Sequence, residues 1–498
     1  MEKYRMYIDG EWADASDGKT TKVVNPATEE VIAEAALGGK AEVERAVKAA
    51  RDSFERGEWR LKDPSERSRI MLDLLSKFRE RAQEILPIEI ANSGAAAKQC
   101  GSFVSSAQNR FEWYAKAANR VFEEAMPIFK FPAAAFPYIR REPIGVCAQI
   151  VPWNAPLVGG VGAIAAPLAA GNSVVVKPAT LTPLSLLEFT KLVSESEIPK
   201  GVVNVIVGPG ESVGESLVSH PEVDKVSFTG STQSGRRVCS LTADGLKRVT
   251  MELGGKSANI FLDDVELNLA VDSAIFGCFF HAGQICYSGT RVLVHASIYD
   301  AFVEKLIKKV KRIKVGDPTD FATDMGALIS EGQRNTVEKY VRIGKDEGAK
   351  LACGGSRPEG LEKGYFFEPT VFVDVDNKMK IAQEEIFGPV MCVIKFEDDN
   401  QAVEIANDSE YGLLGAVWSG NVDRAIGIGE KLRVGNVWIN SFHLQSLDLP
   451  YGGVKQSGIG RERGIHGFLN EYTEVKSMQI DLGHTREQRF WYYLVVPN

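Results

Sequence analysis

One cysteine of the chain stands in a setting that suits a nucleophile. Cys286 lies within residues 279–291, among apolar residues and turn formers, with Gly283 and Gly289 on either side. A thiol is a useful nucleophile only as the thiolate, and its surroundings decide how much thiolate exists. A lone cysteine in an apolar segment is more often a small core residue, so this stretch alone favours a structural role.

Two further polar residues could take part in chemistry with Cys286. Glu252 lies where an apolar run meets two glycines, at the junction of two predicted α/β blocks. A partly desolvated carboxylate there would have a raised pKa, which suits a general base. The amide of Asn154, between two prolines at 152 and 156, could stabilise a developing oxyanion. Taken singly, each of the two residues is more often structural.

Two glycine-rich turns compete as a phosphate-binding loop. In residues 208–214 the third glycine comes one place late and Pro209 interrupts the turn, so this stretch is the weaker candidate. Residues 228–235 follow a predicted strand directly, and Ser231 can cap a helix whose free N–H groups would face a pyrophosphate. A capped turn without a ligand is the competing interpretation. Lys177, at the end of another predicted strand, is placed to meet a ribose or a phosphate.

Composition limits what the chain can be. Its 498 residues allow two or three domains, and 25% charged with 44% hydrophobic residues is typical of a soluble globular protein. The net charge of −8 is spread along the chain and argues against nucleic acid as the main partner. Seven scattered cysteines without CxxC pairs indicate a reducing compartment and no metal site, which predicts a cytoplasmic location. We expect no signal peptide and no membrane span, because the longest apolar run, 155–170, is short and rich in glycine.

The candidate residues must be positioned by alternating strands and helices. Residues 144–254 alternate short β-branched runs with helical stretches, which predicts a parallel sheet that binds ligands at the carboxyl ends of its strands. A second α/β block covers about 257–453. Asp9-Gly10 predicts a tight hairpin near the start. The three prolines of residues 131–143 predict an edge strand or arm outside the main core.

Seven motifs of the chain occur in the order seen in the aldehyde dehydrogenase superfamily, which the sequence resembles from about residue 5 to residue 477. Cys286, Glu252 and Asn154 each lie in one of them. The motifs are residues 152–154, 177–178, 228–231, 252–256, 283–286, 385–389, and 450–453 together with 457–461.

The resemblance implies an α/β fold with two Rossmann-like parallel-sheet domains and a small bridging or oligomerisation element. The cofactor-binding domain would comprise residues 1–123 and 145–253, and the catalytic domain residues 254–455. Residues 124–144 and 456–498 would form the bridging element with a C-terminal tail. In the family this element adds to a neighbour's sheet, so a homodimer or homotetramer is expected. The aromatic tail, 481–498, would either extend that contact or cover its own tunnel mouth.

The resemblance also implies a mechanism. The Cys286 thiolate attacks an aldehyde, and the Asn154 amide and the Cys286 backbone N–H hold the oxyanion. Hydride passes to a nicotinamide, and water activated by Glu252 hydrolyses the resulting thioester to a carboxylic acid. Acylating relatives, which pass the acyl group to coenzyme A, usually lack this glutamate. A coenzyme A-dependent enzyme and a non-catalytic binding or structural protein on the same fold are the alternatives.

The resemblance assigns the cofactor contacts to two groups of residues. Near the nicotinamide are Glu385 and Phe387, and near the adenosine and pyrophosphate are Lys177 and the turn with Gly230, Ser231 and Gly235. Trp153 would pack beneath the cofactor, although a core aromatic serves equally well. Thr180 stands where NAD-preferring members usually carry a glutamate, and threonine would not repel a 2′-phosphate. We therefore expect the chain to accept NADP as well as NAD.

The predicted substrate tunnel has small residues at positions that are bulky in many relatives. Ala155, Gly159 and Gly162 suggest a wide mouth, unless other side chains refill the space. The expected substrate is a medium or bulky aldehyde, including aromatic ones. His281 replaces a common asparagine and is expected to be a packed loop residue. The other predicted wall residues are Ile285, Tyr287, Phe442 and Tyr451.

Overall fold

The computed structural model describes residues 2–120, 124–128 and 134–497. Its first large sheet has the strand order β22-β12-β11-β8-β9-β10-β2-β3. The five central strands are parallel, and β22 and the β2–β3 hairpin are antiparallel additions. The strands are β2 (Met6–Ile8), β3 (Glu11–Ala13), β8 (Val146–Ile150), β9 (Ser173–Lys177), β10 (Val203–Val205), β11 (Lys225–Thr229), β12 (Arg248–Glu252) and β22 (Gly458–Ile459).

Every residue of β9 is buried, because a central parallel strand is covered by helices on both faces. The continuous valine run of β9 suits such a strand. The hairpin turns at Asp9 and Gly10, which both have positive φ, so the sequence predicted it correctly. The helices of this half are α1 (Lys40–Arg56), α2 (Pro64–Glu80), α3 (Ala82–Ser93), α4 (Ala97–Ala117), α5 (Pro156–Ala170), α6 (Leu184–Ser194), α7 (Glu215–Ser219) and α8 (Thr232–Ala243).

The second large sheet has the order β15-β16-β17-β14-β13-β19-β20, parallel except for β15 at one edge. Its strands are β13 (Ala258–Phe261), β14 (Arg291–His295), β15 (Lys350–Cys353), β16 (Thr370–Val373), β17 (Val390–Phe396), β19 (Leu414–Trp418) and β20 (Asn436–Ile439). Its helices are α9 (Leu267–Phe279), α10 (Tyr299–Val310), α11 (Glu331–Asp346), α12 (Lys380–Gln383), α13 (Asp399–Asn407) and α14 (Val422–Gly429). The α/β class with two parallel-sheet units is thus confirmed.

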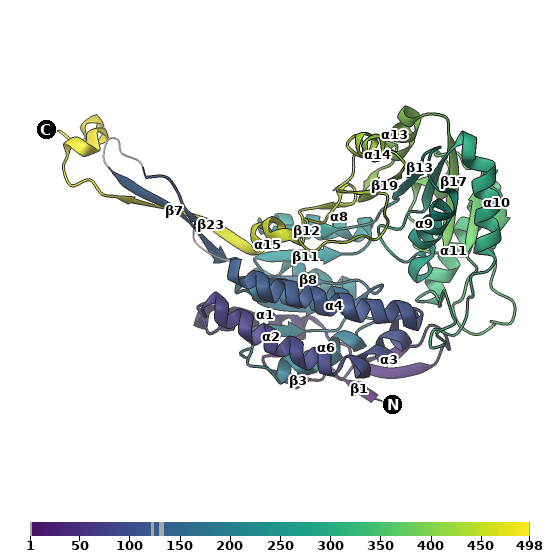
Figure 1. Ribbon diagram of the computed structural model, residues 1–498. Coiled ribbons are helices and arrows are strands. Elements are labelled where there is room, and N and C mark those ends of the chain that lie inside the picture. The colour runs from purple at the N-terminus through teal and green to yellow at the C-terminus, as the bar shows by residue number, and fades with distance from the viewer. Residues whose placement is uncertain (1, 121–123, 129–133, 498) are drawn as a thin grey trace.

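A long two-stranded arm leaves the body of the molecule (Figure 1). In it β7 (Ala135–Pro143) pairs antiparallel with β23 (Thr473–Asp481) along the full length of both strands, and β6 (Glu124–Ala125) adds a short third strand. The C-terminal helical turns of 487–494 lie at the tip of the arm, far from the body. The tail therefore does not cover the tunnel mouth of its own chain, which corrects one of the two predicted positions. Residues 121–123 and 129–133, which the predicted domain and arm boundaries include, lie outside the described residues.

The remaining elements connect these parts. In the described part of the chain no helix is both long and apolar enough to cross a membrane, and no cluster of three or more metal-ligating side chains occurs. The smaller elements are β1 (Glu2–Tyr4), β4 (Thr20–Val24) and β5 (Val31–Ala36) in one sheet, β18 (Tyr411–Gly412) paired with β21 (Val454–Lys455), and α15 (Gly464–Tyr472).

Candidate active site

A tight turn after α9 brings Cys286 to the wall of a cavity. His281, Ala282 and Gly283 all have positive φ. At Gly283 a Cβ would lie 2.2 Å from the Gly388 carbonyl oxygen, so the turn can form only with glycine there. Cys286 follows in a hydrogen-bonded turn, in which the Ser288 N–H donates to the Ile285 carbonyl over 3.0 Å.

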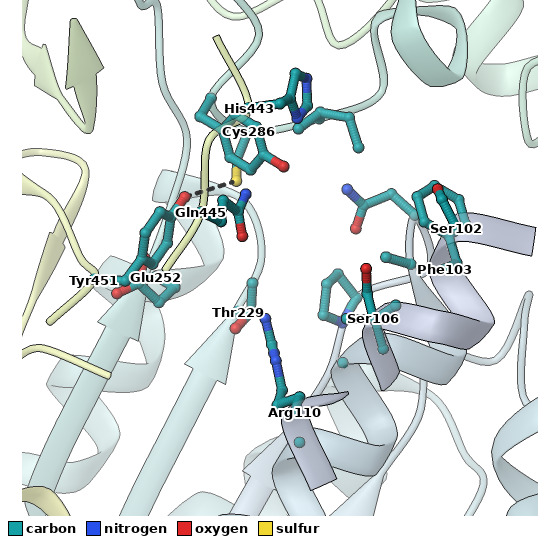
Figure 2. Close-up of a pocket in the computed structure, with 18 of the residues that line it drawn as sticks. Ser102, Phe103, Ser106, Arg110, Thr229, Glu252, Cys286, His443, Gln445 and Tyr451 are labelled. Atoms are coloured by element: carbon teal, nitrogen blue, oxygen red, sulfur yellow. Dashed lines mark hydrogen bonds between the residues drawn. The ribbon is translucent and has the colours of Figure 1, made fainter. Parts of the chain in front are cut away.

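The cavity has a volume of about 960 Å³, and Cys286, Glu252 and Asn154 all line it. Figure 2 shows Cys286 and Glu252 on its wall. Cys286 comes from the loop after α9, Glu252 from the carboxyl end of β12, and Asn154 lies two residues before the start of α5. The structure therefore brings together the sulfur, the carboxyl group and the amide that the sequence placed far apart. Such a cavity is large enough for a drug-sized molecule.

The Glu252 carboxyl group is almost fully buried, and neither of its oxygens has a hydrogen-bond partner among the described residues. Burial, reinforced by the nearby Glu462 carboxylate, raises the pKa of Glu252 well above its usual range. A carboxyl group with a raised pKa is a stronger base in its ionised form than an exposed glutamate. The arrangement therefore suits general acid–base chemistry.

Burial also raises the pKa of the Cys286 thiol to about 12, with further contributions from Glu252 and Glu385. The sulfur lies 3.9 Å from the Tyr451 hydroxyl oxygen. Burial thus favours the neutral forms of both the Cys286 thiol and the Glu252 carboxyl group. Formation of the thiolate therefore needs a proton acceptor.

Asn154 is held in place by the turn that carries the nucleophile. Its Nδ2 donates a hydrogen bond to the Gln284 carbonyl oxygen at 2.7 Å, and the side chain is buried. One amide hydrogen remains for another acceptor. The backbone N–H of Cys286 donates no hydrogen bond to any described residue, so two donors are free near the sulfur.

The residues predicted to meet the adenosine and pyrophosphate lie at the carboxyl ends of β9 and β11. Ser231 caps α8 as predicted, since its Oγ accepts a hydrogen bond from the Ser234 N–H at 3.2 Å. A Cβ at Gly235 would lie 2.4 Å from Leu253, so glycine allows α8 to pack closely there. The Gly230 N–H donates to the Glu252 carbonyl at 3.1 Å, which ties this turn to the end of β12.

Lys177 and Thr180 lie beside the second glycine-rich turn, which the sequence rated the weaker candidate. The Thr180 hydroxyl donates to the Gly208 carbonyl oxygen at 2.9 Å. A Cβ at Gly214 would lie 3.8 Å from the Lys177 side chain. Residues 210–214 form a π-helical turn rather than the tight loop of a dinucleotide fingerprint. This turn therefore differs from a dinucleotide fingerprint loop, and it lies next to two residues of the predicted cofactor site, Lys177 and Thr180.

Glu385, Phe387 and Trp153 form a second group. One Glu385 oxygen accepts a hydrogen bond from the Gly255 N–H at 2.9 Å, and burial raises the pKa of Glu385 to about 7. The Phe387 and Trp153 rings meet edge to face, with centroids 5.2 Å apart. Trp153 therefore packs on another aromatic side chain, which is compatible with both interpretations of this residue.

Six of the seven predicted tunnel residues line the cavity: Ala155, Gly159, Gly162, Ile285, Tyr287 and Tyr451. The prediction of Phe442 as a wall residue is wrong. Its ring is buried in the core, where a Cβ at Gly289 would lie 2.9 Å from it and one at Gly277 3.2 Å. The two glycines leave a space in the core, and the Phe442 ring fills it beside Trp438.

The wide opening predicted at Gly162 is filled by a side chain that the sequence did not single out. A Cβ at Gly162 would lie 2.6 Å from Cδ of Arg110, which comes from α4. The sequence around Arg110 is that of an ordinary amphipathic helix, so it does not reveal that this side chain enters the cavity. His281 does not line the cavity; its buried ring packs edge-on against Phe103, with centroids 5.5 Å apart.

Comparisons with known proteins agree with this geometry. The chain is 42% identical over 474 residues to betaine aldehyde dehydrogenase of Bacillus subtilis, covering 95% of this chain and 96% of the relative. It is 42% identical over 486 residues to aldehyde dehydrogenase 1A1 of Rattus norvegicus, covering 97% and 96%. The crystal structure of Staphylococcus aureus betaine aldehyde dehydrogenase in complex with NAD+ superposes with a TM-score of 0.94 at 41% identity, covering 97% of this chain and 95% of that one. A model of the aldehyde dehydrogenase family matches residues 12–478, and the chain belongs to that family.

Proposed function

We propose that this chain oxidises an aldehyde to the carboxylic acid with NAD+ or NADP+ as hydride acceptor. The observation that supports this function most directly is the meeting of Cys286, Glu252 and Asn154 at one cavity. The aromatic and aliphatic walls, among them Phe103, Phe279 and Tyr287, suit a medium or bulky substrate, including an aromatic one.

The residues act in a definite order. The Cys286 thiol loses its proton to solvent, and the thiolate adds to the carbonyl carbon to give a thiohemiacetal. The free Asn154 N–H and the Cys286 backbone N–H stabilise the oxyanion, and one such donor is typically worth about 3 kcal/mol. Loss of hydride leaves a thioester on Cys286. Glu252 then takes a proton from water as its oxygen attacks the acyl carbon, which releases the acid and the thiolate.

Several observations support a dinucleotide site. The buried Lys177 ammonium has no carboxylate partner among the described residues and donates only to the Pro178 carbonyl, at 3.2 Å. Ser231 caps the helix α8 that would present its N-terminus to a pyrophosphate. One Glu385 oxygen is free to bind the nicotinamide ribose. When bound, NAD(P)+ supplies the acceptor for the hydride that leaves the thiohemiacetal.

A single set of assays separates this function from its alternatives. Purified protein is incubated with hexanal or benzaldehyde and each cofactor, with and without coenzyme A, and absorbance at the reduced cofactor's maximum is followed. We expect turnover without coenzyme A and formation of the free acid, because Glu252 favours hydrolysis. Strict dependence on coenzyme A would indicate the acylating enzyme, and no turnover with any aldehyde would indicate a non-catalytic protein.

Thr180 should decide how well NADP+ binds. We expect Thr180→Glu to weaken NADP+ binding about tenfold or more and to leave NAD+ binding equal or tighter, because a carboxylate there repels a 2′-phosphate. Thr180→Gln has the same length without the charge and is the matched control. Titration of each variant with both cofactors measures the effect. Strict NAD+ selectivity of the unaltered chain would contradict the proposal.

The arm suits self-association. β23 forms an exposed edge of the three-stranded arm, and Val475 and Ile480 on it are about half exposed. We propose that this edge adds to a partner's sheet in a homodimer or homotetramer. Sedimentation at micromolar concentration should show a multiple of 54.5 kDa, and a monomer would contradict the proposal. The cytoplasmic location inferred from the scattered cysteines stays a prediction, open to cell fractionation.

A further inference from the structure

Arg110 is an arginine on the wall of the cavity that forms no ion pair with any described carboxylate. It is partly buried, lines the cavity, and forms no hydrogen bond or ion pair with any described residue. Burial lowers the pKa of its guanidinium to about 10, so the group is still charged at neutral pH. A desolvated charge without a partner costs free energy, and a bound anion would relieve that cost.

The surroundings of Arg110 are shaped to admit a polar ligand. The missing side chain at Gly162 provides the space in which the guanidinium lies. Ser102 and Ser106 precede Arg110 on α4 at intervals of four residues, so the three side chains share one face of the helix. Figure 2 shows them along that helix, on the opposite side of the cavity from Cys286. A polar stripe thus faces the nucleophile across the cavity.

A second arginine lies on the same cavity. Arg463 donates from Nη1 to the Gln445 side-chain oxygen at 2.7 Å, and its guanidinium lies 4.4 Å above the centre of the Tyr451 ring. Its Nε is buried without a hydrogen-bond partner among the described residues. Arg463 also has a positive φ of 59°, an uncommon conformation that the packing around it must stabilise.

The remaining charged groups of the wall do not neutralise both arginines. Lys98 and Asp324 pair with each other at 2.6 Å. Burial favours the neutral acid for Glu252, whose pKa is raised well above its usual range. Among the described residues of the cavity wall, the remaining carboxylate is that of Glu462. It accepts a hydrogen bond from the Ser227 hydroxyl at 3.3 Å.

His443, which also lines the cavity, contributes no charge to its wall. Burial lowers the pKa of His443 to about 4, so its ring is neutral at pH 7. Apart from Glu252, two guanidinium groups therefore face one remaining carboxylate of the described wall, Glu462, which is not ion-paired with either of them. A carboxylate on a ligand could pair with Arg110.

We propose that the substrate is an aldehyde that also carries a carboxylate, separated from the carbonyl carbon by a chain or ring long enough to cross the cavity, and that Arg110 binds this carboxylate with Arg463 adding to the positive potential. The planar guanidinium fork matches a carboxylate in a bidentate geometry. The inference rests on the proposed aldehyde oxidation and narrows its substrate class.

The same charges argue against a cationic substrate. Betaine aldehyde, after which two of the relatives are named, carries a quaternary ammonium group. Two guanidinium groups in the wall repel such a group, because like charges in a site of low polarity interact strongly. The close sequence similarity to these relatives therefore does not transfer their named substrate to this chain.

The test compares substrates that differ only in charge. The kcat/KM of the full-length protein is measured with 6-oxohexanoate, with its methyl ester and with hexanal. We expect the acid to be preferred over the ester about tenfold or more, mainly through a lower KM, since a charge-assisted bond is lost in the ester. Equal use of acid and ester would overturn the inference. Absence of turnover with all three, hexanal included, would instead refute the proposed aldehyde oxidation.

Arg110→Met tests the assigned residue. We expect the preference for the acid over its ester to fall to near unity, with KM for the acid rising more than KM for the ester. Arg357→Met, which removes an exposed arginine paired with Glu338 outside the cavity, is the matched control and should keep the preference. Survival of the full preference in Arg110→Met would overturn the assignment.

A binding measurement on the unaltered protein keeps the test decisive if Arg110→Met does not fold. Adipate and hexanoate are compared as inhibitors of hexanal oxidation. We expect the inhibitory concentration of adipate to be at least about tenfold lower than that of hexanoate, because adipate has a second carboxylate for Arg110. Equal inhibition by the two acids would overturn the inference.

Discussion

Replacing Cys286 by alanine is expected to lower kcat/KM for aldehyde oxidation by at least about 10⁴-fold, since removing a catalytic nucleophile removes the covalent route altogether. The sulfur lies on the cavity wall with Glu252 and Asn154, and no other cysteine of the described chain lines that cavity. Formation of reduced cofactor with hexanal measures the loss.

Cys353→Ala is the matched control, because Cys353 is also a free, partly exposed thiol but lies on β15 at the far edge of the second sheet. It should retain the kcat/KM of the unaltered protein. Binding of NAD+ by Cys286→Ala should be preserved, which separates loss of chemistry from loss of folding. Substantial residual oxidation by Cys286→Ala would show that another group carries the reaction.

Replacing Glu252 by glutamine is expected to separate the two halves of the reaction. The amide has nearly the same shape but cannot accept a proton, so thioester hydrolysis should slow about 10²- to 10⁴-fold, the usual contribution of a general base. Rapid mixing with aldehyde and cofactor should give a burst of up to one reduced cofactor per active site, followed by slow turnover. Steady-state turnover equal to that of the unaltered protein would rule out this role.

The pH dependence supplies a second readout for Glu252. Its carboxylate form is the base, and its pKa is raised above the usual range of a glutamate, so the active fraction increases as pH rises through that raised pKa. The steady-state rate of the unaltered protein should therefore rise with pH, and that of Glu252→Gln should not follow it. Glu89→Gln is the matched control, because Glu89 is also buried with a pKa raised to about 7 but does not line the cavity.

The sequence predicted best those features that depend on local patterns. The hairpin at Asp9 and the cap at Ser231 both follow from turn residues and capping residues within a few positions. The candidate catalytic residues could be named because ordered motifs identify them. Spacing alone could not have placed them together, since a loop, a strand end and a helix start meet only through the packing of two sheets.

The sequence failed where packing between distant segments decides. Arg110 enters the cavity because Gly162, on a different helix, has no side chain, and neither residue alone reveals this. Phe442 lies in the core because Gly277 and Gly289 leave room for its ring. In each case a glycine far away in the sequence determines where a large side chain can lie.

The most direct test of the account is to trap the acyl group on the sulfur. Glu252→Gln is mixed with hexanal and NAD+, quenched in acid during the slow phase, digested and analysed by mass spectrometry. The account predicts a hexanoyl group on the peptide that contains Cys286 and on no other cysteine peptide. A burst of reduced cofactor without any acyl adduct on Cys286 would contradict it.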